Sequence, residues 1–151
     1  MSQSNIKDLA LATEAIHAAR AKLDNMKAEL RLVERIDGRE WKSGADRELE
    51  SIILMVLQEG SDYSILSEES VRLGGESDLQ WIVDPLDGTT NFCLEVPFYC
   101  VSVGLWRNNS PLLGAVLEIP SNRLFTGIVG VGAWCNEIPI KVNVERPVDY
   151  S

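Results

Sequence analysis

The chain has 151 residues, of which 45% are hydrophobic and 25% charged, a balance typical of one globular domain with a real core. No run of 18 or more apolar residues occurs and the N-terminus lacks a secretory signal, which predicts a cytoplasmic protein without a membrane span. The net charge of −9 argues against a nucleic-acid polymer as partner, and a small phosphorylated ligand would need cations or backbone N–H groups to offset that charge.

The first third of the chain predicts one long helix. Apolar residues recur there at alternating spacings of three and four, and neither Gly nor Pro interrupts the pattern before Gly38. A coiled-coil seam is disfavoured because several members are alanine, so we expect a helix docked on its own domain or on a partner subunit. The stripe consists of Leu9, Ala12, Ile16, Ala19, Leu23, Met26, Leu30 and Val33.

A second helix is predicted from near Ser43 to Gly60. Ser43 and Asp46 have the spacing of a capping box, and glycine is a common helix terminator. The predicted buried face is Ala45, Leu49, Ile52, Ile53, Val56 and Leu57.

The rest of the chain predicts short strands joined by polar turns. Such a meander favours an antiparallel sheet, so two helices followed by these strands indicate an α+β domain with helices layered on a sheet. The polar segment Ser70–Leu79 is predicted to be a loop. The predicted strands are Tyr63–Ser67, Gln80–Val83, Tyr99–Trp106, Leu112–Ile119, Leu124–Val129 and Ile140–Val144.

Histidine and cysteine chemistry is disfavoured on this chain. His17, the single histidine, leaves neither a His-rich zinc site nor a Ser-His or Cys-His pair, and it is interpreted as an ordinary helix residue. Cys93, Cys100 and Cys135 fit no close metal-ligand spacing and no disulfide framework. Catalysis, if present, therefore rests on carboxylates.

Two carboxylates bracket a turn after the strand Gln80–Val83. Asp84 stands at the predicted strand end, and Asp87-Gly88 turns the chain, so both acids and the Leu86 carbonyl can face one point. Oxygen donors of this kind suit Mg²⁺, Mn²⁺ or Ca²⁺ better than zinc. The N–H groups that follow the turn are suited to a phosphate.

A second acidic pair, Glu68-Glu69, follows the strand Tyr63–Ser67. Its two side chains lie on opposite faces, so Glu68 can point toward the same site. Each feature alone has a structural interpretation, since Asp-Gly and Asp-Pro are common turn dipeptides and adjacent glutamates are usually solvated. The combination of two acidic strand ends is what favours a cation site that positions a phosphate and activates water.

The run WIVDPLDGTTNF at 81–92, preceded by ILSEES at 65–70, resembles the metal-binding region of the inositol monophosphatase family. These enzymes are Mg²⁺-dependent, typically lithium-sensitive phosphatases, related to the 3′(2′),5′-bisphosphate nucleotidases. The weaker matches GADRELE at 44–50 and GAWCN at 132–136 extend the resemblance over most of the chain. The resemblance implies the N-terminal half of a layered αβαβα fold, with two helices packed on a largely antiparallel sheet.

The resemblance also implies roles for individual residues. Asp46 and Thr89 would form the pair that activates the attacking water, with Glu68 taking part in catalysis. Gly88 and Thr89 would bind the phosphate through backbone N–H groups. Two or three Mg²⁺ ions would be bound, Mn²⁺ would be a possible substitute, and Li⁺ would inhibit. The implied metal ligands are Glu68, Asp84, the Leu86 carbonyl and Asp87, with Glu69 and Thr90 as less direct neighbours.

Departures from the family pattern concern substrate choice and completeness. The chain has Asn136-Glu137 where Asn-Gly is usual, and Leu94 where a polar or basic residue often stands. None of its four tryptophans is followed by aspartate, whereas family members complete the site with a Trp-Asp motif from a C-terminal sub-domain. We therefore expect residues 1–151 to be an N-terminal metal-binding sub-domain without its C-terminal partner.

The resulting hypothesis is a phosphomonoesterase for an inositol, sugar or nucleotide monophosphate, truncated and impaired when alone. One alternative is a non-catalytic metal-binding or interaction protein derived from this fold. Another is one half of a split enzyme, with the C-terminal half encoded separately. A homodimer is a further possible assembly.

Overall fold

The computed structural model describes residues 3–26, 33–36, 40–68, 73–74 and 77–142. The helices are α1 (Gln3–Asp24), α2 (Gly44–Gly60) and α3 (Thr89–Cys93). The strands are β1 (Val33–Ile36), β2 (Glu40–Ser43), β3 (Ser64–Ser67), β4 (Leu79–Asp87), β5 (Cys100–Arg107), β6 (Ser110–Glu118), β7 (Arg123–Ile128), β8 (Gly132–Cys135) and β9 (Ile138–Ile140).

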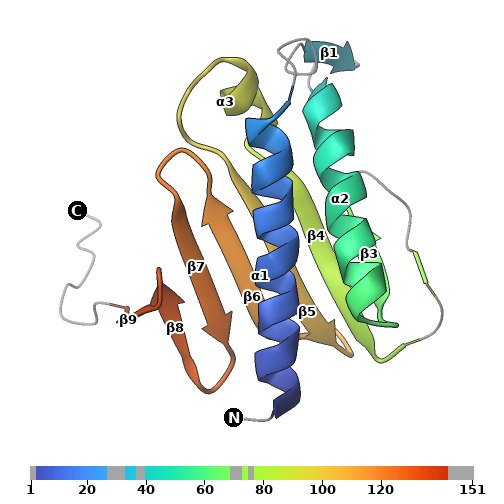
Figure 1. Cartoon of the computed structure of the whole chain (residues 1–151), viewed down its shortest axis with the longest axis vertical. Helices are drawn as coiled ribbons and strands as arrows, with labels where there is room; N and C mark the ends of the chain where they lie inside the picture. Colours follow the sequence, from blue (N-terminus) through green and yellow to red (C-terminus); the bar gives the residue numbers. More distant parts are fainter. Residues whose placement is uncertain (1–2, 27–32, 37–39, 69–72, 75–76, 143–151) are drawn as a thin grey trace, which may run out of the picture.

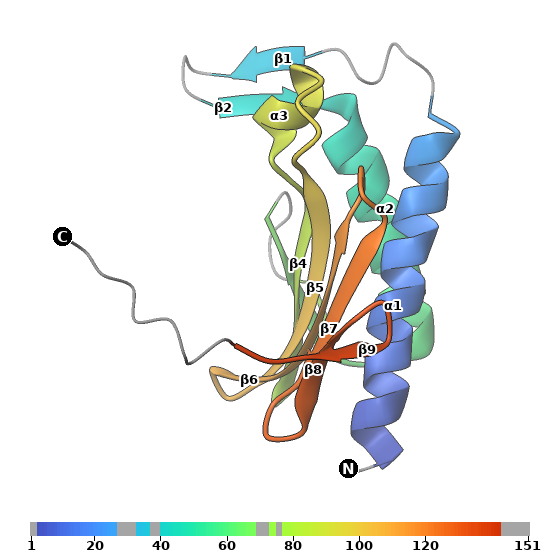
Figure 2. The same cartoon turned by 90° about the vertical axis from the view of Figure 1, so that its left-hand side faces the viewer.

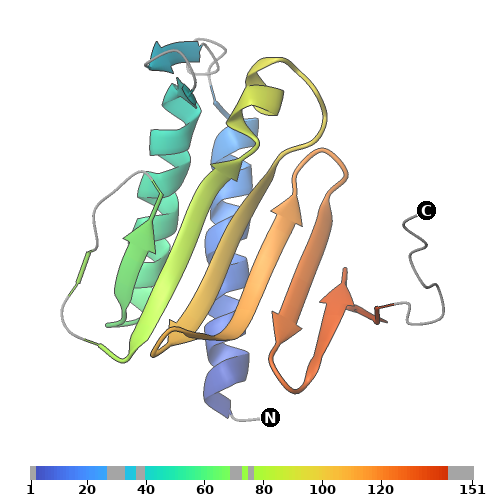
Figure 3. The ribbon, with the colours of Figure 1, turned by 180° about the vertical axis from the view of Figure 1, so that it is seen from behind.

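A seven-stranded sheet in the order β3-β4-β5-β6-β7-β8-β9 forms the main layer. The long helices α1 and α2 lie side by side on one of its faces (Figures 1 and 2). The opposite face carries no helix among the described residues (Figure 3). Neighbouring strands are antiparallel except β3 and β4, which are parallel. The predicted α+β class with helices on a largely antiparallel sheet is confirmed.

Helix α1 is shorter than the sequence pattern predicts. It ends at Asp24, and Val33 belongs to β1, so the prediction of one helix through Val33 was wrong. The Ala21 carbonyl accepts both the backbone N–H of Asn25 at 3.3 Å and its side-chain amide at 2.8 Å, so Asn25 closes the last turn of the helix. Leu30 of the predicted stripe lies outside the described residues.

The buried stripe of α1 explains its close approach to the sheet. Ala12, Ile16 and Ala19 are fully buried and Leu23 is almost so, at spacings of three and four that place them on one face. The small alanines let the helix backbone approach α2 and β6. The alternative interpretation, a helix docked on its own domain, therefore describes α1.

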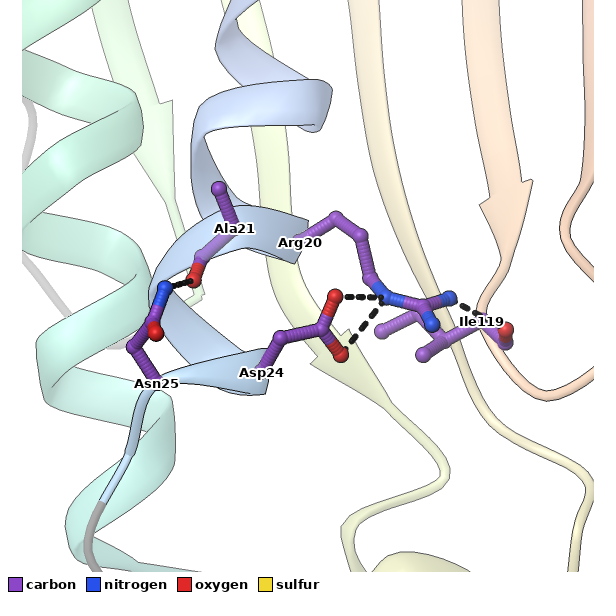
Figure 4. A network of polar contacts seen from close by, with 5 residues as sticks. All are labelled: Arg20, Ala21, Asp24, Asn25 and Ile119. Atoms are coloured by element: carbon purple, nitrogen blue, oxygen red, sulfur yellow. Dashed lines mark hydrogen bonds and ion pairs between the residues drawn. The ribbon is translucent and has the colours of Figure 1, made fainter.

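A side-chain network fixes the last turn of α1 to the sheet (Figure 4). The Arg20 guanidinium donates to both Asp24 carboxylate oxygens at 3.0 and 2.9 Å and to the Ile119 carbonyl at 2.5 Å. Ile119 immediately follows β6, so Arg20 links the helix to the end of a central strand.

Removal of the Arg20 side chain should weaken this link. We expect Arg20→Ala to lower the free energy of unfolding by about 1.5 kcal/mol, because a partly buried carbonyl loses a charged donor. Lys22→Ala is the matched control: it breaks an exposed pair with Glu48 and should cost at most about 0.5 kcal/mol. Urea unfolding of both variants measures the difference, and equal losses would contradict the assigned link.

Helix α2 and most strands lie where the sequence predicts them. The helix ends at Gly60 as expected, and Ala45, Leu49, Ile53 and Leu57 of its predicted face are buried, whereas Ile52 and Val56 are partly exposed. The side chain of Ser43 lies outside what the structure describes, so its capping interaction with Asp46 stays a prediction. The last predicted strand, Ile140–Val144, was misplaced, because β9 spans Ile138–Ile140 and residues 141–142 are not in a strand; residues 143–144 lie outside the described residues.

Other strands also differ from the sequence-based expectation. The β1–β2 hairpin and β8 were not predicted. β4 does not end at Val83 but continues through Pro85 to Asp87. The β4–β5 pairing shifts register between Asp84 and Asp87, and a proline without an N–H group is tolerated at such an irregularity. The carboxylates are therefore carried by an irregular strand end rather than by a loop.

The face of the sheet that lacks helices contains a trough of small residues. Gly104, Gly114, Gly127 and Ala133 are consecutive cross-strand partners on β5, β6, β7 and β8. Because these residues carry little or no side chain, they line a cavity of about 610 Å³ that extends over this face. Within the described residues, no helix is both long and apolar enough to span a bilayer.

Candidate active site

The candidate site lies at the end of the sheet where β4 turns into α3. Gly88 makes this turn with φ 86° and ψ 33°, a left-handed conformation that favours glycine. A Cβ atom on Gly88 would lie 3.0 Å from the Phe98 carbonyl oxygen and 3.2 Å from the Tyr99 Cα. Both the backbone conformation and the tight packing therefore require glycine here.

Asp84 and Glu68 meet because β3 and β4 are parallel neighbours. Ser67 pairs with Val83, and the Glu68 N–H donates to the Val83 carbonyl at 3.1 Å, so the residues after both strands lie side by side. Burial, followed by the charges of Glu68 and Asp87, raises the pKa of Asp84 to about 7. The Leu86 N–H donates to Asp84 Oδ1 at 3.1 Å and opposes that shift.

Asp87 has a thiol neighbour that the sequence did not reveal as part of the site. Cys100 Sγ donates to Asp87 Oδ2 at 3.6 Å across the β4–β5 pairing. Burial and the Asp87 charge raise the pKa of the Cys100 thiol to about 12, so the thiol stays protonated at neutral pH. The cross-strand register of β5 against Asp87 is the information that the sequence alone did not supply.

Asp46 and Thr89 are in direct contact although 43 residues separate them. Asp46 lies in the first turn of α2 and is 3% exposed, and Thr89 opens α3. The Thr89 hydroxyl lies 2.8 Å from Asp46 Oδ1 and 3.0 Å from the Leu86 carbonyl oxygen. It carries one proton, so it donates to one of these acceptors at a time. A carboxylate, a hydroxyl and a carbonyl thus meet at the α2–β4–α3 junction.

Asn91 holds the segment that covers the Gly88 turn, a role that the sequence did not reveal. The side-chain amide of Asn91 donates to the Phe98 carbonyl at 2.7 Å, and the backbone carbonyl of Asn91 accepts from the Val96 N–H at 2.8 Å. The same Phe98 carbonyl is the nearest atom to a Cβ on Gly88. A cavity of about 240 Å³ beside Asp87 and Gly88 is lined in part by Phe98, Cys100 and Glu118.

Other predicted site residues are less closely assembled. Glu69 lies outside the described residues, and Thr90 is exposed on α3. Glu68 and Asp87 are also exposed. In the part of the chain that the structure describes, no group of three or more His, Cys, Asp or Glu residues is arranged to hold a metal ion. Their roles, like those of Leu86 and Gly88, stay predictions.

The family model described as the inositol monophosphatase family matches residues 3–150. The chain belongs to this family. The inositol-1-monophosphatase of Synechocystis sp. is 37% identical over 147 residues, which are 95% of this chain and 51% of that protein. A protein of Haemophilus influenzae named Nus factor SuhB is 35% identical over 114 residues, covering 74% of this chain and 43% of that protein.

Solved structures agree with the family assignment. The inositol monophosphatase of Anabaena (Nostoc) sp. superimposes with a TM-score of 0.76 at 36% identity, covering 90% of this chain and 49% of that chain. The two helices and the mixed, mostly antiparallel sheet match the N-terminal half of such structures. The chain spans about half the length of these relatives.

The family is typically Mg²⁺-dependent, and the donors at this site suit that ion. Asp84, Asp87, Glu68 and the Leu86 carbonyl offer oxygen atoms only, which Mg²⁺ prefers. Burial, and after it the charges of Glu68 and Asp87, raise the pKa of Asp84, and a bound cation favours the charged form of such a carboxylate. The donor set therefore fits Mg²⁺, although the carboxylates do not form a closed ligand shell.

Proposed function

We propose that this chain provides the metal-binding half of a Mg²⁺-dependent phosphomonoesterase of the inositol monophosphatase type. The observation that carries the proposal is the Thr89–Asp46 contact of 2.8 Å beside the acidic end of β4. A buried carboxylate that accepts from a hydroxyl is suited to receiving a proton through that hydroxyl. The substrate class proposed is an inositol, sugar or nucleotide monophosphate.

The proposed reaction assigns a task to each group at the site. Thr89 Oγ1 accepts a hydrogen bond from the attacking water. As the water oxygen bonds to phosphorus and the ester P–O bond breaks, a water proton passes to Thr89 Oγ1 and the hydroxyl proton of Thr89 passes to Asp46, while the departing alkoxide takes a proton from solvent. The N–H groups of Gly88 and Thr89 bind the phosphate at the left-handed turn. Asp84, Asp87, Glu68 and the Leu86 carbonyl would hold Mg²⁺. When bound, Mg²⁺ supplies charge neutralisation and a more acidic water.

The remainder of the family fold is part of this proposal. The chain spans half of its relatives, and the trough of Gly104, Gly114, Gly127 and Ala133 leaves an apolar face that further protein can cover. We therefore infer that substrate choice and full activity need sequence beyond these residues, in the same chain or in a separate one. A 151-residue chain assayed alone is expected to have weak activity or none.

The test measures phosphate release from inositol 1-phosphate and from adenosine 3′,5′-bisphosphate, with and without Mg²⁺. The chain is assayed alone and joined to the remaining half of the Synechocystis relative. We expect Mg²⁺-dependent release by the joined protein on one of the two substrates, at least about 100-fold lower in Thr89→Ala and retained to within about tenfold in Thr89→Ser. Absence of Mg²⁺-dependent release on both substrates by a folded joined protein would contradict the proposal.

A non-catalytic role is the second candidate, and two observations favour it. No described group of three ligating side chains is arranged for a metal, and some relatives bear the name Nus factor rather than that of an enzyme. In this case the joined protein would be folded and monodisperse yet release no phosphate. The same assay therefore separates the two functions.

A further inference from the structure

A second large cavity, of about 620 Å³, lies on the helix-bearing face between α1 and the strands β7 and β8. We call it the α1–β8 groove. Its walls are α1 on one side and Leu124, Thr126 and Trp134 on the other. Figures 1 and 2 show that α1 and α2 cover the β3–β6 part of this face, with β7 and β8 beyond α1. The groove is separate from the carboxylates of the candidate active site.

The α1 wall of the groove has the spacing of a helix-packing face. Ile6, Leu9, Thr13 and His17 recur at intervals of three and four and all line the groove. Leu9 also packs against the core at the edge of the buried face of α1, whereas Ile6 remains 49% exposed. A stripe with this period along a groove beside the helix suits a second helix lying along α1.

The α1–β8 groove carries negative charge. Glu14 of α1 and Glu137 of the β8–β9 turn both line it, and Glu137 is exposed. None of the described residues that line it is Lys or Arg, and the whole chain carries a net charge of −9. A basic partner is therefore attracted, whereas an anionic lipid surface or a second copy of this chain would meet charge of its own sign.

Glu137 occupies a backbone conformation that costs stability. The β8–β9 turn has φ 47° at Asn136 and φ 66° at Glu137, and two-residue hairpin turns with both φ values positive favour Asn-Gly. A glutamate in the second position is strained relative to glycine. The strain places a carboxylate at the groove, and such retained strain is a recognised mark of functional positions.

We propose that the α1–β8 groove binds an amphipathic helix of a partner protein, with apolar residues on one face and Lys or Arg on its flanks. The apolar face packs on Ile6, Leu9 and Trp134, and the basic flanks lie against Glu14 and Glu137. This interaction is independent of phosphate hydrolysis, since it uses no residue of the candidate active site.

The probe is a synthetic helix-forming peptide of about 18 residues, which is long enough to follow α1. It carries Leu at intervals of three and four and Lys at the flanking positions, and a second peptide has Glu in place of every Lys. Calorimetric titration of the whole chain should give a dissociation constant at least about tenfold lower for the Lys peptide. Its binding should weaken as salt is raised.

Two glycine variants separate a docking role from a structural one. Glu137→Gly should raise the midpoint of thermal unfolding because it relieves backbone strain. It should also weaken binding of the Lys peptide about fivefold or more. Glu95→Gly is the matched control, because Glu95 is also exposed with φ 57° but does not line the groove. It should raise the midpoint and leave binding unchanged. Ile6→Lys should reduce binding about tenfold or more without unfolding the chain.

Several results would overturn the proposal. Equal binding of both peptides, absence of binding by the Lys peptide, or unchanged binding in Glu137→Gly and Ile6→Lys would each do so. Analytical ultracentrifugation provides a further check on the occupant. A wild-type dimer that Ile6→Lys converts to a monomer would show that a second copy fills the groove instead.

Discussion

Asp84→Asn should make the metal-free chain more stable than wild type at pH 8. Burial and the neighbouring charges of Glu68 and Asp87 raise the pKa of Asp84 to about 7, from 3.8. Between those two pH values the folded wild type binds more protons than the unfolded chain, so its free energy of unfolding falls as pH rises. A half-buried group realises only part of this linkage, which gives a loss of about 2 kcal/mol by pH 8.

The measurement is urea unfolding of both proteins at several pH values from about 4 to 8, with divalent cations removed. The wild-type curve should descend relative to that of Asp84→Asn and level off above pH 7. About 10 mM Mg²⁺ at pH 8 should restore wild-type stability and leave Asp84→Asn largely unchanged. Asp78→Asn is the control, because Asp78 lies just before β4, at the opposite end of the strand from Asp84. This variant should keep the wild-type dependence of the free energy of unfolding on pH. A parallel pH dependence in wild type and Asp84→Asn would refute the raised pKa.

Part of the candidate site lies in one short run of the sequence, and part depends on contacts between residues far apart in the sequence. The run from Asp84 to Thr89 supplies two carboxylates, a glycine turn and a hydroxyl within six positions, so its chemistry is readable directly. The contact of Asp46 with Thr89 joins α2 to α3 and was anticipated only through resemblance to a family. Cys100 meets Asp87 through the β4–β5 register, which neither spacing nor composition specifies.

The secondary structure was likewise predictable only where the sequence pattern is regular. The central strands were found because their buried positions alternate, as at Val101, Val103 and Leu105, and a period of two is a strong signal. The β1–β2 hairpin was missed because Val33 continued the apolar spacing of the preceding helix. Asn25, whose backbone N–H and side-chain amide both donate to the Ala21 carbonyl, stands at the true end of that helix.

Parallel pairing of β3 with β4 is the feature that connects fold to site. A hairpin would have placed the residue after β3 far from the end of β4, whereas the parallel register Ser67–Val83 brings Glu68 beside Asp84. The segment that returns from β3 to the start of β4 makes this pairing possible. The proximity of Glu68 to Asp84 is thus a consequence of topology, and together with burial it raises the pKa of Asp84.

Gly88→Ala should lower the free energy of unfolding by about 3 kcal/mol, more than the same change at Gly130. Both glycines have positive φ, 86° and 73° respectively, so alanine at either position costs about 1–2 kcal/mol of backbone strain. Around Gly130 nothing lies within 4 Å of a new Cβ, whereas at Gly88 the Phe98 carbonyl lies at 3.0 Å. Crowding adds about 1–2 kcal/mol at Gly88 alone.

Urea unfolding of both variants measures the difference, and a double-mutant cycle with Asn91→Ala identifies its source. Asn91 holds the Phe98 carbonyl at 2.7 Å, so loss of its amide lets that carbonyl move away from the new Cβ. The cost of Gly88→Ala should therefore be smaller by about 1 kcal/mol in the Asn91→Ala background. The cost of Gly130→Ala should not change there. Equal costs at the two glycines, or strict additivity of Gly88→Ala with Asn91→Ala, would mean that the segment over Gly88 moves freely and does not hold the Gly88 turn in place.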